Sequence, residues 1–213
     1  MMKYNFDEVH DRHNTYCTQW DYTADRFGKE GILPFSISDT DFIIPEPITV
    51  KIKELSEQRI YGYTLWNHHD FKSAVSSYYE RRFHTSINED WILYSPSVMY
   101  SVSLLIRLLS KEGDSVLSFN PMYDSFFTVI EGNHRRLVSN NLVAENGTFR
   151  IDFDFLNEQL SECQIMLLCS PHNPTGRMWT RQELVQILEL CRKHNVKVIS
   201  DEIHMDMQNT ERR

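Results

Sequence analysis

The sequence predicts an α/β fold: a mostly parallel sheet with helices on both faces. Two observations support this prediction. From residue 91 onward, short apolar runs alternate with segments of helical periodicity, which is typical of strand–helix–strand units. The run Ile165–Cys169 is apolar at every position, as a strand covered by helices on both faces must be.

Five short apolar runs are the predicted strands, and the segments between them have helical spacing. The predicted strands are Trp91–Tyr94, Val116–Phe119, Arg136–Val138, Ile165–Cys169 and Val196–Ser200. The predicted helices between them are Val98–Leu109, Asp124–Glu131, Asp154–Leu160 and Arg181–His194, the last with Thr180 as its N-cap.

The first 90 residues are predicted to contain an irregular arm and two helices. Residues 1–45 are expected to form an irregular arm, and residues 46–207 part of one large domain, with 208–213 as a divergent polar tail. A helix after Pro47 should place Ile48, Ile52 and Leu55 toward a core, and a second helix is expected at Asp70–Phe83.

The composition excludes several classes of protein. The 213 residues carry a formal net charge of −8, which argues against a general nucleic-acid or anionic-membrane surface because both need basic patches. No apolar run resembles a signal peptide or a membrane span. The four cysteines have no Cys-x-x-Cys spacing, so we expect a cytoplasmic protein with reduced thiols.

Polar motifs follow four of the predicted strands: Ser95–Tyr100, Asn120–Tyr123, Ser170–Gly176 and Asp201–His204. Each motif alone would be read as a turn or loop. Ligands of open parallel sheets, however, bind beyond the carboxyl ends of the strands. If the sheet is parallel, all four motifs meet at one edge, and that edge is the predicted site.

The combination of side chains at this edge suits a pyridoxal cofactor. Such a cofactor needs a carboxylate beside its pyridine nitrogen, and Asp201 offers one. Asn173 and His204 offer polar partners, and Tyr123 a stacking ring. The backbone of Ser97–Tyr100, at the start of a predicted helix, offers N–H groups and a helix dipole for the phosphate.

With these motifs, the sequence resembles the MalY/PatB group of cystathionine β-lyase-type C–S lyases, within the fold-type I superfamily of pyridoxal-phosphate (PLP)-dependent, aspartate aminotransferase-like enzymes. The resemblance covers residues 2–207, the N-terminal portion of the family. It is carried by Asp11–Thr15, Ser38–Phe42, Tyr61–Tyr63, Ser95–Val98, Asn120–Asp124, Ser170–Gly176 and Ser200–Met207.

The resemblance implies roles for individual residues. Asp201 would pair with the pyridine nitrogen, Asn173 with the ring oxygen, and Tyr123 would stack on the ring. His204 takes the place that a tyrosine holds in many aminotransferases. Residues that would reach the phosphate are, by the same resemblance, Val98 and Met99 through backbone N–H groups and Tyr63 from the neighbouring subunit of a homodimer.

The implied reaction is β-elimination from cystathionine or another amino-acid thioether, giving a thiol, pyruvate and ammonia. The family's Schiff-base lysine lies beyond the matched region, as do the rest of the large domain and the small domain. We therefore expect an incomplete large domain without a catalytic residue, inactive by itself.

Three other hypotheses remain open. The lineage could be that of a class I/II aminotransferase, or the chain could be a non-catalytic remnant or partner-binding fragment. The weakest hypothesis is a metal site formed by Asp201, Glu202, His204 and Asp206. Alternation along an extended segment would put Asp201 and His204 on opposite faces.

Overall fold

The computed structural model describes residues 4–207, so the predicted tail at 208–213 lies outside the described residues. The chain forms two compact units, the first ending at Leu65 and the second beginning at Trp66. The expected division into an arm and a large domain at 45/46 stays a prediction. None of the described helices combines the length and apolar character that a membrane crossing requires.

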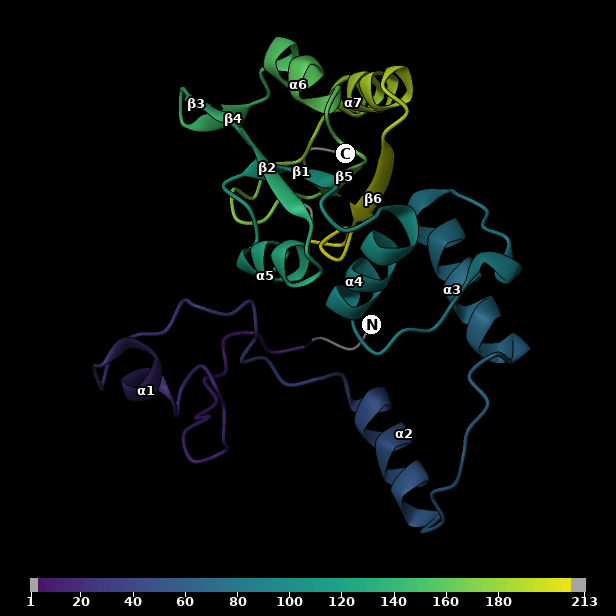
Figure 1. The fold of residues 1–213 in the computed structure, drawn as a ribbon. Helices are drawn as coiled ribbons and strands as arrows, with labels where there is room; N and C mark the ends of the chain where they lie inside the picture. The colour runs from purple at the N-terminus through teal and green to yellow at the C-terminus, as the bar shows by residue number, and fades with distance from the viewer. Residues whose placement is uncertain (1–3, 208–213) are drawn as a thin grey trace. The chain divides into compact units, whose positions relative to one another are not determined.

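The second unit is built on a four-stranded sheet in the order β2-β1-β5-β6 (Figure 1). Every neighbouring pair is parallel, which confirms the predicted fold class. The strands are β1 (Ser115–Asn120), β2 (Arg136–Asn141), β5 (Ile165–Cys169) and β6 (Lys197–Asp201).

Helices cover both faces of this sheet. Helices α4 (Val98–Leu109) and α5 (Asp124–Gly132) lie on one face, and α6 (Phe153–Leu160) and α7 (Arg181–Lys193) on the other (Figure 1). Each bound lies within one residue of its prediction, and α4 matches at both ends. The sequence periodicity therefore placed the four helices correctly.

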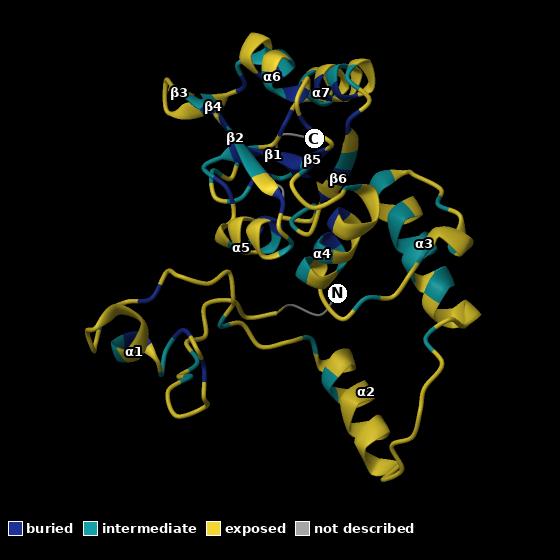
Figure 2. Ribbon diagram, in the orientation of Figure 1, coloured by how far each residue is buried: buried dark blue, intermediate teal, exposed yellow. Residues whose placement is uncertain are grey.

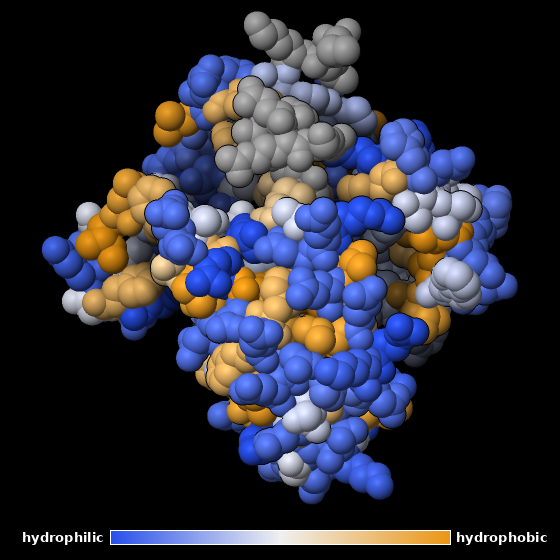
Figure 3. All heavy atoms as spheres, turned by 90° about the horizontal axis from the view of Figure 1, so that it is seen from above, coloured by the Kyte–Doolittle hydropathy of each residue, from blue (hydrophilic) through white to orange (hydrophobic). Residues whose placement is uncertain are grey.

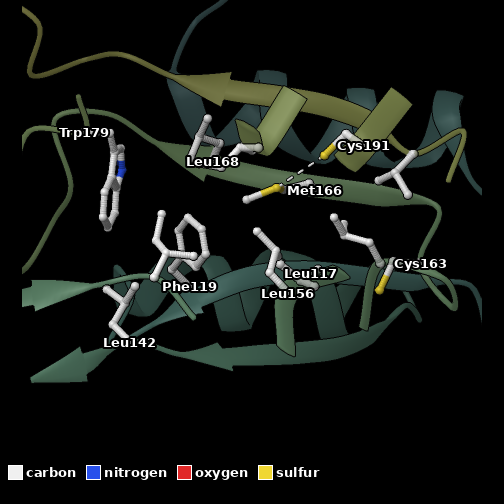
Figure 4. Packing of buried hydrophobic residues seen from close by; sticks show 13 residues of the cluster. Leu117, Phe119, Leu142, Leu156, Cys163, Met166, Leu168, Trp179 and Cys191 are labelled. Atoms are coloured by element: carbon white, nitrogen blue, oxygen red, sulfur yellow. Dashed lines mark hydrogen bonds between the residues drawn. The ribbon is translucent and has the colours of Figure 1, made fainter. Parts of the chain in front are cut away.

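Alternation along β5 divides the core into two layers. Met166 and Leu168 join the cluster that includes residues of α6 and α7, and Figure 4 shows them facing Leu117 and Phe119 of β1. Ile165, Leu167 and Cys169 join the cluster on the side of α4 and α5. Because β5 is buried at all five positions, the prediction of a strand apolar on both faces is confirmed.

The predicted N-cap of α7 is confirmed by a capping box. The Thr180 hydroxyl accepts a hydrogen bond from the Glu183 backbone N–H at 3.2 Å, and the Glu183 carboxylate accepts one from the Thr180 N–H at 2.8 Å. This exchange satisfies two backbone donors that a helix start leaves without partners.

The predicted strand Trp91–Tyr94 was wrong. A 3₁₀ turn (η1, Glu89–Trp91) occupies its start, and Trp91 and Leu93 are 76% and 80% exposed. A strand exists only when another pairs with it, and no described residue does so here. The local apolar pattern was correct, but the partner that would make it a strand is not among the described residues.

The two helices before this segment have little buried surface. Helix α2 (Glu46–Glu57) contains no buried residue, and Ile48, Ile52 and Leu55 are 50%, 56% and 49% exposed. The expectation that these three side chains face a core was therefore wrong, as the exposed colouring of α2 shows (Figure 2). Helix α3 (His69–Phe83) likewise contains no buried residue.

Three short elements were not anticipated. Helix α1 (Thr23–Phe27) interrupts the expected irregular arm. Strands β3 (Val143–Glu145) and β4 (Thr148–Arg150) form an antiparallel hairpin. Its turn, Asn146-Gly147, has φ values of 51° and 74°, the pair of positive angles that a two-residue type I′ hairpin turn requires.

The surface in Figure 3 is mainly hydrophilic, and hydrophobic side chains reach it in separate groups. Many of the exposed apolar side chains belong to the first unit, including Val9 at 94% and Phe35 at 89%. The buried apolar residues, by contrast, come almost entirely from the second unit. The sheet and its four helices are therefore the part of the chain with a layered core.

Replacing Leu117 by alanine should test this core. Leu117 is 0% exposed, so L117A should lower the free energy of unfolding by about 2–5 kcal/mol through lost burial and a cavity. The matched control is L188A on α7, where the leucine is 50% exposed and a change below about 1 kcal/mol is expected. Urea denaturation of both variants measures the difference; equal losses would contradict this core assignment.

Candidate functional site

Three of the predicted motifs meet at one edge of the sheet. Strands β1, β5 and β6 are parallel, and they end at Asn120, Cys169 and Asp201. In the register, Cys169 lies opposite Asp201, and the Ser170 N–H donates to the Asp201 carbonyl at 2.9 Å. The loops after β5 and β6 therefore begin side by side, as the parallel sheet predicted.

Asp201 is the buried carboxylate of this edge. It is 8% exposed, and its Oδ1 accepts a hydrogen bond from the Ile203 backbone N–H at 3.1 Å. It shares a pocket of about 450 Å³ with Val98 and Ser101 of α4. The fourth motif thus reaches the same edge through a helix, although the strand predicted before it is absent from the described structure.

Val98, the first residue of α4, lines this pocket beside the N-terminal end of the helix. Ser97 is the N-cap, and its hydroxyl accepts from the Tyr100 N–H at 3.2 Å. The N–H groups of Val98 and Met99, the first two helical residues, have no acceptor within the helix. Together with the positive end of the helix dipole, they form a place suited to an anion.

The loop after β5 is fixed by a buried histidine. His172 is 3% exposed, and its Nδ1 lies 2.7 Å from the Thr175 hydroxyl. Its ring centroid lies 5.3 Å from that of Trp179 and 6.4 Å from that of Phe119. Asn173, the next residue, is half-buried, so His172 anchors the loop that carries it.

Cys169 precedes this loop, lies opposite Asp201 in the register, and is buried. Burial raises the pKa of its thiol to about 11, the Asn173 backbone N–H acts in the opposite direction, and the negative charge of Asp201 adds to the rise. The nucleophilic form of a cysteine is the thiolate. Cys169 is therefore a packing residue of this edge.

Met99 does not line the pocket, and the remaining predicted site residues lie outside it as well. Tyr123 is the N-cap of α5, 38% exposed, with its ring edge-on to Phe126 at 5.8 Å. His204 is half-buried in the turn after β6. Neither lines the pocket with Asp201, and neither does Asn173. Tyr63 belongs to the first unit and is fully exposed.

The backbone after β6 differs from the expected extended segment. It turns, with the Met205 N–H donating to the Glu202 carbonyl at 2.9 Å and the Met207 N–H donating to the His204 carbonyl at 2.9 Å. The alternation argument used against a metal site was therefore wrong in its geometry. Residues 4–207 contain no group of three or more His, Cys, Asp or Glu side chains placed to hold a metal ion.

Of the residues that line the pocket, only Val98 and Asp201 were predicted to bind the cofactor, and those missed include two polar residues on helices. Ser101 lies three residues after Val98 on α4, and Tyr79 comes from α3. A signal existed for Ser101, because residues three and four apart share a helix face and Val98 was a predicted site residue. No local signal marks Tyr79, whose position depends on how α3 packs.

Two other motifs that carry the family resemblance pair with each other inside the first unit. Arg12 bonds Asp39 at 2.8 Å and Asp41 at 2.9 Å, and the Trp20 indole N–H donates to Asp41 at 3.1 Å. The Arg12 hydrogen bond holds the pKa of Asp41 below its usual value. These contacts join two segments of the first unit that lie about thirty positions apart in the sequence. The residues therefore have a structural role within that unit.

Comparison with known proteins now identifies the family. The family model "Aminotransferase class I and II" matches residues 30–212. The chain belongs to this family. It is 44% identical to protein MalY of Escherichia coli (strain K12) over 206 residues, which are 96% of this chain and 53% of MalY. It is 38% identical to cystathionine beta-lyase PatB of Bacillus subtilis (strain 168), covering 95% of this chain and 53% of PatB.

A solved structure supports the same assignment. A PLP-bound putative aminotransferase from Clostridium difficile 630 superposes with a TM-score of 0.92 at 36% sequence identity, over 96% of this chain and 53% of that one. The fold is thus the class I and II aminotransferase fold, and the resemblance to the MalY/PatB group is confirmed. The chain spans about half the length of these relatives.

His172 should make stability depend on pH. Burial lowers its pKa from 6.5 to about 4, so it stays neutral in the folded protein while the unfolded chain binds a proton below about pH 6.5. The contribution of neutral His172 to the free energy of unfolding is fully present above about pH 6.5. It is lost as the pH falls from 6.5 toward 4. Between pH 7.5 and 5 this amounts to about 2 kcal/mol.

Urea denaturation at both pH values measures this loss. The control is H172Q, which keeps hydrogen-bonding groups but has no titrating group in this range. Its loss of stability between pH 7.5 and 5 should be smaller than that of the unmodified chain by about 2 kcal/mol. The same loss in both proteins would show that His172 is not the responsible group.

Proposed function

We propose that this chain provides one part of the cofactor site of a PLP-dependent C–S β-lyase. The substrate would be cystathionine or a related amino-acid thioether, and the products a thiol, pyruvate and ammonia. The observation that carries this proposal is that buried Asp201 and the first turn of α4 line a single pocket. The 38% identity to a protein named cystathionine beta-lyase supports the reaction class.

The polar groups of the pocket fit PLP. A buried carboxylate is costly unless it is paired, and the side chain of Asp201 has one hydrogen-bond donor among the described residues, the Ile203 N–H. A protonated pyridine nitrogen would be a suitable partner for it. The unpaired N–H groups of Val98 and Met99 would bind the phosphate. When bound, PLP acts as the electron sink for bond breaking at the substrate.

Three other residues are proposed to complete the site from the same edge. Asn173 would donate to the ring oxygen, Tyr123 would stack on the ring, and His204 would add a polar contact near Asp201. Tyr63 would act in a homodimer, reaching the phosphate of the neighbouring subunit. Its full exposure within the first unit is compatible with that contact.

The pocket lining contains no lysine. Lys193 donates to Asn157 at 2.9 Å from α7, and Lys197 begins β6, at the opposite end of the strand from Asp201. No described residue of the pocket therefore offers an amine for a covalent bond to PLP or for removing the substrate's α-proton. We propose that the 213-residue chain alone binds the cofactor weakly and does not catalyse the reaction.

An aminotransferase is the second candidate, because the family description and the name of the Clostridium difficile protein both give that activity. The two reactions differ in their products. A lyase releases pyruvate and a thiol, whereas an aminotransferase transfers the amino group to an acceptor oxo acid and leaves the thioether bond intact.

The cellular setting is proposed as the cytoplasm. All four cysteines are free and buried, as expected for a protein that needs no oxidising compartment.

A hybrid protein tests the proposed reaction. Residues 1–207 are joined to the part of E. coli MalY that lies beyond the matched region, and pyruvate and thiol are measured with PLP and cystathionine. The 213-residue chain alone should give no pyruvate above the buffer level. The hybrid should release pyruvate and thiol in equal amounts.

Variants of the hybrid assign the role of Asp201. D201A should lower kcat/KM at least about 100-fold, because it removes the charge that pairs with the cofactor. The control D154N changes an exposed carboxylate of α6 and should keep full activity. Transfer of the amino group to an oxo acid without pyruvate release would instead favour the aminotransferase.

A further inference from the structure

The residues on either side of Asn173 close a short loop. The His172 N–H donates to the Arg177 carbonyl at 2.8 Å, and the Gly176 N–H donates to the His172 carbonyl at 2.8 Å. His172 and Arg177 therefore pair as an antiparallel bridge, and residues 173–176 project from it. Gly176 has a φ of 67°, the left-handed backbone that lets so short a loop turn back. The position of Asn173 thus depends on the pair at the base of the loop.

One tryptophan ring packs on both residues of this base. Trp179 is 4% exposed, and its indole N–H donates to the Cys169 carbonyl at 2.9 Å. Its ring centroid lies 5.3 Å from that of His172. The Cζ atom of Arg177 lies over the same ring, 4.6 Å from the centroid, where a cation is attracted by the ring electrons. Trp179 therefore connects the base of the loop to the end of β5.

Arg177 also forms an ion pair with the start of the next helix. Its Nη2 donates to the Glu183 carboxylate at 2.7 Å, and the two side chains are only 19% and 17% exposed. Such a pair is screened by salt and solvent much less than one on the surface. Because Glu183 belongs to the capping box of α7, the pair joins the loop to that helix.

The other terminal nitrogen of Arg177 supports this arrangement. Nη1 is buried and has no hydrogen-bond partner among the described residues. The described interactions of the cation are thus with Glu183 and with the ring of Trp179. A charge of low exposure that is held by two groups should have little freedom to move.

We propose that Arg177 is a positioning residue of the cofactor site. By fixing the base of the loop, it holds Asn173 in place for the ring oxygen of the cofactor. A group that is held in its binding position loses less freedom when the ligand binds. Arg177 acts through the loop and not by touching the ligand. The inference rests on the proposed function, because the role of Asn173 is taken from there.

Binding of pyridoxine 5′-phosphate to the 213-residue chain tests this role by equilibrium dialysis. This probe keeps the ring oxygen and the phosphate of PLP, and it has no aldehyde to react with surface lysines. N173A should raise its dissociation constant about tenfold, the size of one hydrogen bond. R177Q should raise it about three- to tenfold, because the loop is no longer held in one position. The control R181Q changes the exposed first residue of α7 and should leave the constant unchanged.

A double-mutant cycle separates positioning from a general loss of stability. If Arg177 acts through Asn173, the double variant N173A/R177Q should bind the probe as N173A does, within about twofold. E183Q should resemble R177Q, because a glutamine can keep the helix cap but not the ion pair. R177K keeps the positive charge beside Glu183 and should recover part of the lost affinity.

Hydrogen exchange gives a second readout that needs no ligand. The His172 and Gly176 amides both donate within the loop. R177Q should speed their exchange at least about fivefold relative to the amides of β5, because the loop opens locally. N173A and R181Q should leave this exchange unchanged.

Circular dichroism shows whether each variant is folded, and E183Q with R177K decides if R177Q is not. Additive effects of N173A and R177Q on the dissociation constant, or unchanged affinity and loop exchange in R177Q, would overturn the positioning role alone. No binding by the unmodified chain, or normal binding by N173A, would reject the cofactor site of the proposed function and this inference with it.

Discussion

The parallel pairing of β5 with β1 and β6 is the constraint on which the second unit depends. All five residues of β5 are buried, and they alternate between the two apolar clusters. A shift of one residue would exchange the faces of every side chain. The same register sets Cys169 opposite Asp201, so the pairing that builds the core also brings the polar loops together.

Local patterns in the sequence were sufficient where a segment's surroundings are fixed by its own periodicity. Helix α4 was predicted at Val98–Leu109, and Thr180 was predicted as the N-cap of the last helix. The hairpin turn at Asn146-Gly147 carried an equally local signal that was overlooked. The strand Trp91–Tyr94 failed for another reason: its pattern is apolar, but a strand depends on a partner distant in sequence.

The site was predictable in outline and not in detail. Parallel strand order alone implies that the residues after β5 and β6 share an edge, and the structure brings them there. The backbone turns after β6 instead of continuing as an extended segment to His204. The turn begins where the Ile203 N–H donates to the Asp201 carboxylate. Such a local side-chain hydrogen bond competes with strand pairing, and the apolar pattern of the sequence does not reveal it. The contribution of Tyr79 depends on the packing of α3, which periodicity cannot supply.

The lining of the pocket beside β6 combines two chemically different sets of residues. The first set is polar: Asp201 is a buried carboxylate, and the first turn of α4 is the positive end of a helix dipole. Together they suit a small ligand that carries both a cationic and an anionic group. The second set, Val102, Leu105 and Ile199, offers apolar surface. Because charge interactions strengthen as water is excluded, these apolar neighbours should strengthen the attraction between Asp201 and a cationic group of its ligand.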